Sequence, residues 1–397
     1  MKLGSVLVVV DYYQAGCFFV NLAKNDIRRK YKVLTTLPSI KLLCRDNGIE
    51  CRLLSNLNGQ YDNEVYKIGP KDRVRETQTG VMSLKNANVY KDILYHEIDT
   101  SIIENKHESI ICWNGEDVIG YTCRLFRGRV KTRFLEISNI PGKIFADSKG
   151  VNASSSLFKN IEKLDALRND DLVFENWKEN YIDYKVKHSI VKQAINGRKI
   201  GVHNFYDTLY AQFLGGKWQS FKYLYDKFKI KVKKNSVSEL INFERNINGG
   251  FIFFPMQVSN DSQIVLNSKI GGNFEVVDLI LNRNSKYNLV VKPHPAEQDM
   301  AYLERFVNKY KNKVTFSNDN TFELLKKSAK VYTINSTVGL EALILGKSVE
   351  FLGESIFSSF NEKRLQAYIS NFLINIDFFE SSKISQSEID RVFDDIL

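Results

Sequence analysis

Three short apolar runs in the second half of the chain each stop abruptly at a polar segment. The runs span 249–255, 287–291 and 330–334, are rich in aromatic and β-branched residues, and have the length of buried strands. Between the first two, apolar residues recur at helical spacing over 273–284. Because a strand, helix, strand order closes as a right-handed parallel unit, the sequence predicts an α/β sheet whose strands end along one common edge.

Polar residues follow directly after these three predicted strands. They are Gln257, Asp261 and Gln263 after the first strand, Lys292 and His294 after the second, and Ser336 and Thr337 after the third. Each alone has an ordinary structural explanation as a helix cap, a turn residue or a proline-flanked bend. Their coincidence at the edge where open α/β sheets bind ligands predicts a shared site. Ser336 and Thr337 also precede the helix predicted at 338–345, where N–H groups and hydroxyls suit a phosphate.

The first half of the chain shows the same alternation. Apolar runs at 5–11, 32–37 and 49–54 predict strands, with a helix that ends near residue 25. The 397 residues, 43% of them hydrophobic, suffice for two cores. We therefore expect an α/β protein with two Rossmann-like domains facing across a cleft. The expected limits are 1–160 for an acceptor-side domain, 161–248 for a helical connection, 249–355 for a nucleotide-sugar-binding domain, and 356–397 for helices that pack back on the first domain.

The order of these motifs resembles the bacterial capsule polysaccharide biosynthesis family that contains the retaining β-Kdo transferases. The resemblance rests on Phe-Pro-Met-Gln-Val-x-x-Asp-Ser-Gln-Ile, then Lys-Pro-His-Pro, then Asn-Ser-Thr-Val-Gly-Leu-Glu-Ala-Leu-x-Leu-Gly-Lys. Segments 113–115, 134–143 and 147–152 are similar to the family's N-terminal half. The resemblance implies a GT-B-like enzyme that transfers Kdo, an acidic sugar, from CMP-β-Kdo to a capsule or lipopolysaccharide O-antigen glycan.

The resemblance also implies roles for individual residues. Asp261 matches the catalytic nucleophile, and His294 and Ser336 match the residues that hold the donor phosphate. Glu341 matches the glutamate that meets the nucleotide ribose. Glu136 is the weakest match, to the base that deprotonates the acceptor hydroxyl.

The residue types fit this chemistry independently of the family. Transfer of an acidic sugar with retention needs one carboxylate to trap the oxocarbenium-like centre and a second group to activate the acceptor, as in retaining glycosidases. Asp261 and Glu136 could divide these tasks, although Asp147, Asp117 or Glu116 could replace Glu136 as the base. The expected donor-binding residues are Gln257, Gln263, Lys292, His294, Ser336, Thr337 and Glu341. Since the sequence contains no Asp-x-Asp or Cys-x-x-Cys motif and no paired histidines, we expect neither a metal ion nor another cofactor.

Charge and cysteine content suggest where such a protein works. No segment approaches the ~20 apolar residues of a membrane span, and the five scattered cysteines are typical of a reduced cytoplasmic protein. The net charge of +10 would attract an anionic donor and a lipid-linked or oligosaccharide acceptor at the inner membrane face. No nucleic-acid-binding module is recognised. Two alternatives stay open: a transferase that uses CMP-sialic acid or CDP-glycerol, and a non-catalytic assembly or export partner.

Overall fold

The chain forms two compact units, each with its own mainly or fully parallel sheet. The computed structural model describes residues 4–54, 66–187, 203, 206, 207, 209, 210, 241–283, 287–380 and 382–394. Unit 1 contains Met1–Ala166, Ile200–Tyr223 and Asn371–Leu397, and unit 2 contains Leu167–Lys199 and Leu224–Ser370. Most of the helical connection predicted at 161–248 lies outside the described residues. The expectation of an α/β protein with two parallel-sheet units is confirmed.

The sheet of unit 1 has six strands in the order β3-β2-β1-β4-β5-β6. The strands are β1 (Gly4–Val9), β2 (Arg29–Thr35), β3 (Glu50–Leu53), β4 (Ser109–Trp113), β5 (Lys131–Ile137) and β6 (Ile144–Asp147). All neighbours pair in parallel except β5 and β6. The strands predicted at 5–11, 32–37 and 49–54 are therefore present, with ends shifted by a few residues.

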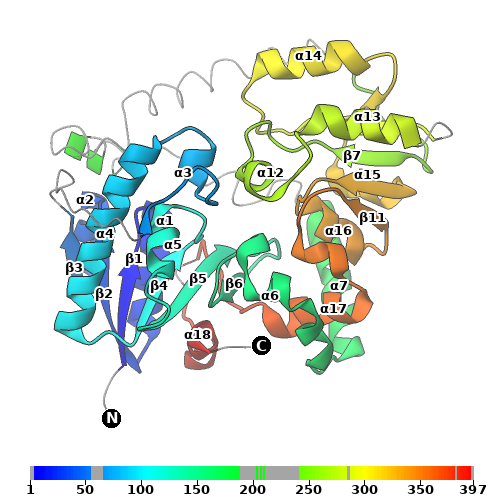
Figure 1. The fold of residues 1–397 in the computed structure, drawn as a ribbon. Helices are drawn as coiled ribbons and strands as arrows, with labels where there is room; N and C mark the ends of the chain where they lie inside the picture. Colours follow the sequence, from blue (N-terminus) through cyan, green and yellow to red (C-terminus); the bar gives the residue numbers. More distant parts are fainter. Residues whose placement is uncertain are drawn as a thin grey trace. The chain divides into compact units, whose positions relative to one another are not determined.

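Helices cover both faces of this sheet (Figure 1). The helices of unit 1 include α1 (Tyr13–Asn25), α2 (Pro38–Asp46), α3 (Arg75–Gln78), α4 (Leu84–Asn105), α5 (Val118–Arg124), α6 (Ser156–Lys159) and α18 (Gln386–Phe393). On one face, Val6 and Val8 of β1 share a core with α1, α2 and α18. Leu7 and Val9 point to the opposite face and are equally buried, and α4 packs against β1. Burial on both faces explains why β1 reads as a continuous apolar run.

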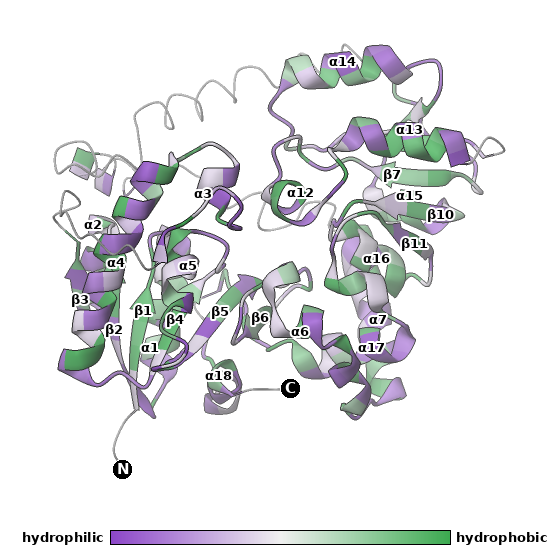
Figure 2. Cartoon of the chain, viewed as in Figure 1, coloured by the Kyte–Doolittle hydropathy of each residue, from purple (hydrophilic) through white to green (hydrophobic). Residues whose placement is uncertain are grey.

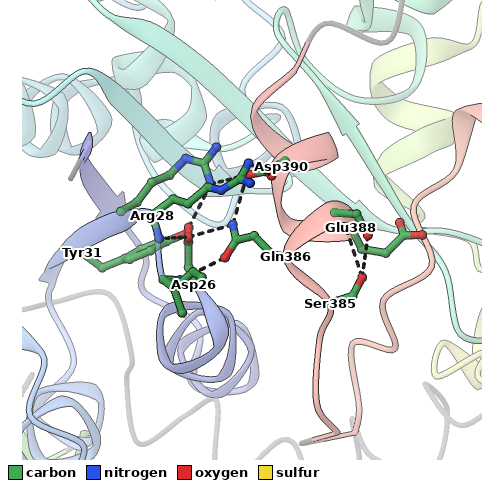
Figure 3. Close-up of polar contacts among 10 residues, drawn as sticks. Asp26, Arg28, Tyr31, Ser385, Gln386, Glu388 and Asp390 are labelled. Atoms are coloured by element: carbon green, nitrogen blue, oxygen red, sulfur yellow. Dashed lines mark hydrogen bonds and ion pairs between the residues drawn. The ribbon is translucent and has the colours of Figure 1, made fainter. Parts of the chain in front are cut away.

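The C-terminal helix α18 completes unit 1. Gln386, at the start of α18, donates hydrogen bonds of 3.0 Å to both Asp26 and Asp390. Figure 3 shows these contacts. Arg28 pairs with Asp390, and the Tyr31 hydroxyl donates to Asp26 at 2.7 Å. The returning tail was expected to begin at residue 356, but residues 356–370, which include α17 (Glu362–Ala367), group with unit 2.

Unit 2 contains a fully parallel five-stranded sheet in the order β11-β10-β7-β8-β9. The strands are β7 (Ile252–Pro255), β8 (Leu289–Lys292), β9 (Thr315–Phe316), β10 (Lys330–Thr333) and β11 (Ser348–Phe351). The helices include α7 (Asp171–Lys187), α12 (Ser262–Asn267), α13 (Asn273–Arg283), α14 (Met300–Tyr310), α15 (Thr321–Lys327) and α16 (Val338–Ile344). The predicted β7, α13, β8 unit and the strand and helix at 330–345 are thus confirmed.

Hydrophobic side chains explain how the helices of unit 2 pack. Phe254 of β7 shares a core with α13 and α14, including Val277 and Phe306. Figure 2 shows β7 coloured as hydrophobic, whereas α13 and α14 carry both hydrophilic and hydrophobic residues. Within the part of the chain that the structure describes, no helix combines the length and the apolar character that crossing a membrane would need.

Candidate active site

Unit 2 brings the three predicted polar segments to one edge of its sheet. β10, β7 and β8 are adjacent and parallel, so their carboxyl ends lie side by side. The segments that follow contain Ser336, Asp261 and His294 respectively. The predicted meeting of three strand ends is therefore present in the fold.

Gln257 links the segments that follow β7 and β10. This residue is 4% exposed, its Nε2 donates to Asn335 Oδ1 at 3.0 Å, and its Oε1 accepts from the Asn335 backbone N–H at 3.1 Å. The Asn335 side-chain Nδ2 donates to the Gln263 backbone carbonyl at 2.7 Å. The Asn273 side chain accepts the Gln257 backbone N–H and donates to the Gln257 backbone carbonyl. The Gln263 side chain accepts from Asn267 Nδ2 at 2.9 Å. Both predicted donor-binding glutamines thus have structural partners, and their contact with a donor stays a prediction.

Asp261 lies at the N-terminus of α12 with one oxygen engaged. Its Oδ1 accepts the Gln263 backbone N–H at 2.8 Å, which fixes the side chain as the helix cap. The contact of Oδ2 is with Gln257 Nε2 at 3.5 Å, the outer limit of a hydrogen bond. The side chain is only partly buried. Oδ2 is therefore the oxygen that retains lone pairs for another partner.

His294 is arranged as a neutral hydrogen-bond donor. Its Nδ1 accepts the Ala296 backbone N–H at 3.1 Å, so in the neutral ring Nε2 carries the proton. Burial lowers the pKa of His294, and Lys292 lowers it further, against opposing effects from Asp261 and Glu297. The imidazole is therefore uncharged at neutral pH, with Nε2–H as its available donor.

Glu297 connects the loops that follow β7 and β8. It is 8% exposed, and its Oε2 accepts the Ser259 backbone N–H at 2.7 Å, while Oε1 accepts the Ser259 hydroxyl at 3.0 Å. Oε1 also accepts the backbone N–H groups of Gln298 and Asp299. Glu297 was not predicted from the sequence, although it lies only three positions after His294.

The remaining predicted phosphate ligands differ in how far they are engaged. Lys292 Nζ donates to the Asp319 carbonyl at 2.5 Å, and burial lowers its pKa. The Ser336 hydroxyl accepts the Val338 backbone N–H at 3.2 Å, so it contributes to the start of α16. Thr337 is exposed and makes no side-chain capping bond.

Glu341, the predicted ribose ligand, forms an ion pair that the sequence did not suggest. Its Oε1 lies 2.5 Å from Lys185 Nζ of α7, and the two side chains are only 12% and 14% exposed. Lys185 falls within the segment expected to be a helical connection, but it belongs to unit 2.

Unit 1 has its own polar cluster at the carboxyl ends of its central strands. Glu136 lies near the end of β5, where it accepts Asn114 Nδ2 at 2.7 Å through Oε2 and the Ile137 backbone N–H at 3.1 Å through Oε1. Asn114 Oδ1 in turn accepts the Glu116 backbone N–H at 3.1 Å. Asn114, which follows β4, therefore orients the predicted base and its neighbours together.

A tight turn after β4 makes this arrangement possible. Asn114 and Gly115 both have left-handed backbone conformations, with φ of 70° and 82°, a region that asparagine and glycine tolerate best. The turn packs against α5 at Gly120, where an added Cβ would lie 2.2 Å from the Gly115 Cα. Glycine is thus required for the close approach of α5 to the turn.

Several carboxyl groups in this cluster have pKa values near neutrality. Burial raises the pKa of Glu136 to about 7; neighbouring carboxylates add to the effect and Arg75 opposes it. Burial also raises the pKa of Glu76 to about 7 and that of Asp11 to about 6, each with a further contribution from Asp117. Asp11, Arg75 and Glu76 were not predicted from the sequence.

Two of the three alternatives to Glu136, Asp147 and Asp117, have carboxylates with structural roles. Asp147 accepts the backbone N–H and hydroxyl of Ser156 at 2.9 and 2.6 Å, along with other N–H groups of the same turn. Asp117 caps α5 by accepting the Gly120 N–H at 2.7 Å. Glu116 is 2% exposed, and its backbone carbonyl accepts the N–H of Arg75. The Glu136 side chain is half-buried, and its role as the base stays a prediction.

The described residues offer no group of three or more His, Cys, Asp or Glu side chains arranged to hold a metal ion. Among these residues, the carboxylates around Arg75 form no such group either. The expectation that no metal is needed therefore stays a prediction about the mechanism.

Comparisons with known proteins place the chain in a family. Protein FixF of Sinorhizobium fredii (strain NBRC 101917 / NGR234) is 38% identical over 114 residues, which span only 28% of this chain and 28% of FixF. The Thermosulfurimonas dismutans KpsC β-Kdo 2,7 transferase structure aligns with 75% of this chain and 88% of its own, at 16% identity and a TM-score of 0.42. The β-Kdo 2,4 transferase of the same organism's KpsC covers 72% and 79%, at 14% identity and a TM-score of 0.39. The profile of the capsule polysaccharide biosynthesis proteins matches residues 95–360, more than half of the chain. The chain therefore belongs to the capsule polysaccharide biosynthesis protein family.

Proposed function

We propose that this protein is a retaining glycosyltransferase that moves Kdo from CMP-β-Kdo to a cell-surface glycan, a capsule or lipopolysaccharide O-antigen. Membership of the capsule polysaccharide biosynthesis family supports the glycan context. The observation that carries the proposal is the grouping of Asp261, His294 and Ser336 after three neighbouring parallel strands of one sheet. This grouping supplies a carboxylate nucleophile beside uncharged hydrogen-bond donors suited to a phosphate.

The first half of the reaction uses the residues of unit 2. Asp261 Oδ2 attacks the anomeric carbon of Kdo, the bond from that carbon to the phosphate oxygen breaks, and its electron pair leaves with CMP. The Nε2–H of His294 and the hydroxyls of Ser336 and Thr337 donate hydrogen bonds to the departing phosphate. Lys292 adds positive charge near the same strand ends. These groups balance the developing charge without a metal ion.

The second half of the reaction uses Glu136. The acceptor hydroxyl oxygen attacks the same anomeric carbon, the ester bond to Asp261 breaks, and Glu136 takes the hydroxyl proton. Two displacements restore the original configuration. Since burial raises the pKa of Glu136 to about 7, it can accept this proton near neutral pH and release it afterwards.

The proposed setting follows from the substrates. The donor and a lipid-linked or oligosaccharide acceptor are both anionic, which a protein of net charge +10 attracts. We place the enzyme in the cytoplasm, peripherally at the inner face of the cytoplasmic membrane.

Intact-protein mass spectrometry tests the donor and the nucleophile together. The wild type and Asp261→Asn are incubated with CMP-Kdo, generated in situ because the donor is labile, and analysed before and after addition of acceptor. A covalent Kdo adduct on the wild type that peptide mapping places at Asp261, and that Asp261→Asn lacks, is the expected result. Asp278→Asn is the matched control: it makes the same change on α13, where Asp278 pairs with Lys309 at 2.8 Å, and should still form the adduct.

Two outcomes would contradict the proposal. Turnover of CMP-sialic acid or CDP-glycerol without turnover of CMP-Kdo would reassign the donor. Absence of nucleotide release from all three donors, together with normal glycan synthesis in cells that carry Asp261→Ala, would favour a non-catalytic assembly or export partner.

A further inference from the structure

One face of α7 carries a row of aromatic side chains that leads to a lysine. Phe174, Trp177 and Tyr181 stack in succession, with ring centroids 5.7 and 5.1 Å apart. Tyr181 also packs edge-on against Phe322 of α15, at 6.2 Å between centroids. Lys185 follows Tyr181 by four residues and so lies on the same face of the helix. The packing of the aromatic row fixes this face within unit 2.

The Lys185 side chain forms an ion pair with Glu341 and is largely shielded from solvent. The two charged atoms are 2.5 Å apart, and both side chains are largely buried. Burying an ion pair removes water from both charges, so a pair of this kind is a poor way to gain stability alone. It does fix the position and the charge of the Glu341 carboxylate. The pair engages Oε1, and the contacts among the described residues give Oε2 no partner.

Tyr181 supplies the second observation. Its side chain is 5% exposed, and among the residues that the structure describes its hydroxyl has no hydrogen-bond partner. Buried hydroxyls are nearly always satisfied, so an orphaned one requires an explanation. Burial raises the pKa of Tyr181, and the nearby Glu341 carboxylate raises it further. The hydroxyl therefore keeps its proton and can donate a hydrogen bond to a ligand.

We infer that Tyr181 and Lys185 of α7 are part of the donor-nucleotide site. Lys185 is a positioning residue that holds Glu341 so that Oε2 accepts hydrogen bonds from the ribose hydroxyls. Tyr181 donates its hydroxyl hydrogen to an acceptor atom of the same nucleotide. The inference rests on the proposed function and on the predicted contact of Glu341 with the nucleotide ribose, and adds to them a helix expected only to connect the two domains.

Calorimetric titration with CMP and with 2′,3′-dideoxy-CMP tests both residues, because the second ligand lacks the hydroxyls that Glu341 would bind. Lys185→Met should weaken CMP binding about tenfold and leave the dideoxy nucleotide nearly unchanged, since only the ribose contact depends on the pair. Tyr181→Phe should weaken CMP binding about two- to tenfold, while the melting temperature stays equal or rises because a buried unsatisfied hydroxyl is removed. Lys178→Met is the matched control: Lys178 is on the same helix but pairs with Glu175 at 3.3 Å.

Each result decides the roles of the two residues. If Lys185→Met leaves the ratio of the affinities for CMP and dideoxy-CMP at the wild-type value, Lys185 is structural. If Tyr181→Phe changes only the melting temperature, Tyr181 is structural. Either result means that the inference is wrong for that residue. A wild type that binds none of CMP, CDP, UMP and UDP would overturn the proposed function as well. If a nucleotide other than CMP binds, the donor is reassigned. The affinities of that nucleotide and of its dideoxy form are then compared in the same variants, which tests Tyr181 and Lys185 independently of the identity of the donor.

Discussion

Glu136, the proposed general base, should change its charge within the working pH range of the proposed enzyme. A general base acts in its deprotonated form, and burial raises the pKa of Glu136 to about 7. The rate should therefore rise with pH and level off above about 7 as the carboxylate forms. Glu136→Gln removes the proposed base and should lower kcat by about 10²- to 10⁴-fold. Initial rates between pH 5 and pH 9 measure both effects.

Matched variants separate this role from general damage. Glu104→Gln makes the same change at an exposed position of α4 and should retain the wild-type profile. Glu76 also has a pKa raised to about 7. If Glu136→Gln keeps the wild-type rate while Glu76→Gln removes the rise with pH, the base has been assigned to the wrong carboxylate.

Residue positions were predictable where a motif follows a strand directly. Asp261, His294 and Ser336 are of this kind, because the end of a short apolar run fixes where the next side chains must lie. Glu297 and Lys185 were not predictable, because their partners, Ser259 and Glu341, are 38 and more than 150 positions away along the chain. Hydrogen bonds between separate loops leave no periodic signal in one sequence.

At the scale of elements, the loop that carries Asp261 depends on a contact from its neighbour. Glu297, in the loop after β8, accepts both hydrogen-bond donors of Ser259, two residues before Asp261. In Glu297→Gln, the amide oxygen can replace Oε1 as the acceptor of the Ser259 hydroxyl. The amide nitrogen then takes the place of Oε2, and because it is a donor it cannot accept the Ser259 backbone N–H. We expect kcat to fall about 10- to 100-fold, because a small displacement of a nucleophile is costly.

Nucleotide affinity distinguishes positioning from unfolding in this variant. The dissociation constant for CMP should change by no more than about twofold, a difference of roughly 0.4 kcal/mol. Glu304→Gln, exposed on α14, should change neither value. Equal losses of kcat and of nucleotide affinity would show that Glu297 supports the whole site rather than the nucleophile loop.

The packing of α16 on the sheet gives a second prediction at this scale. An added Cβ at Gly339 would lie 2.4 Å from a ring carbon of Phe351 and 3.0 Å from Thr333. Alanine improves helix propensity by only about 1 kcal/mol, whereas overpacking costs typically about 1–3 kcal/mol. Gly339→Ala should therefore lower the free energy of unfolding in urea. Gly128→Ala meets nothing within 4 Å and serves as the control.

Element types followed from the sequence more readily than their ends or their grouping. β7, α13 and β8 match the predicted runs because apolar periodicity reports burial directly. The antiparallel β6 was not foreseen, since its four buried residues carry no signal of strand direction. α7 was taken for part of a connection because its aromatic row, ending at Tyr181, resembles any amphipathic helix; its contacts with Phe322 of α15 and Glu341 of α16 join it to unit 2.

At the scale of the whole molecule, unit 1 is assembled from both ends of the chain. Ile374 forms an isolated antiparallel bridge with Ile144, the first residue of β6, and Ile389 and Val392 of α18 are buried in the same core as Val8. Unit 2 has a separate core around Phe254. The C-terminal segment should therefore stabilise the first unit selectively, although it follows the second unit in sequence.

Hydrogen exchange can test whether this core acts separately. Ile389→Ala should destabilise unit 1 by about 2–5 kcal/mol, because it leaves a cavity in a fully buried site. Amide exchange in β1 should then accelerate far more than exchange in β7, since local stability follows the core that was weakened. Ile27→Ala, at a position 78% exposed, should leave both rates unchanged. Equal acceleration in β1 and β7 would mean that the two sheets unfold as one cooperative unit, and that the selective role assigned to α18 is wrong.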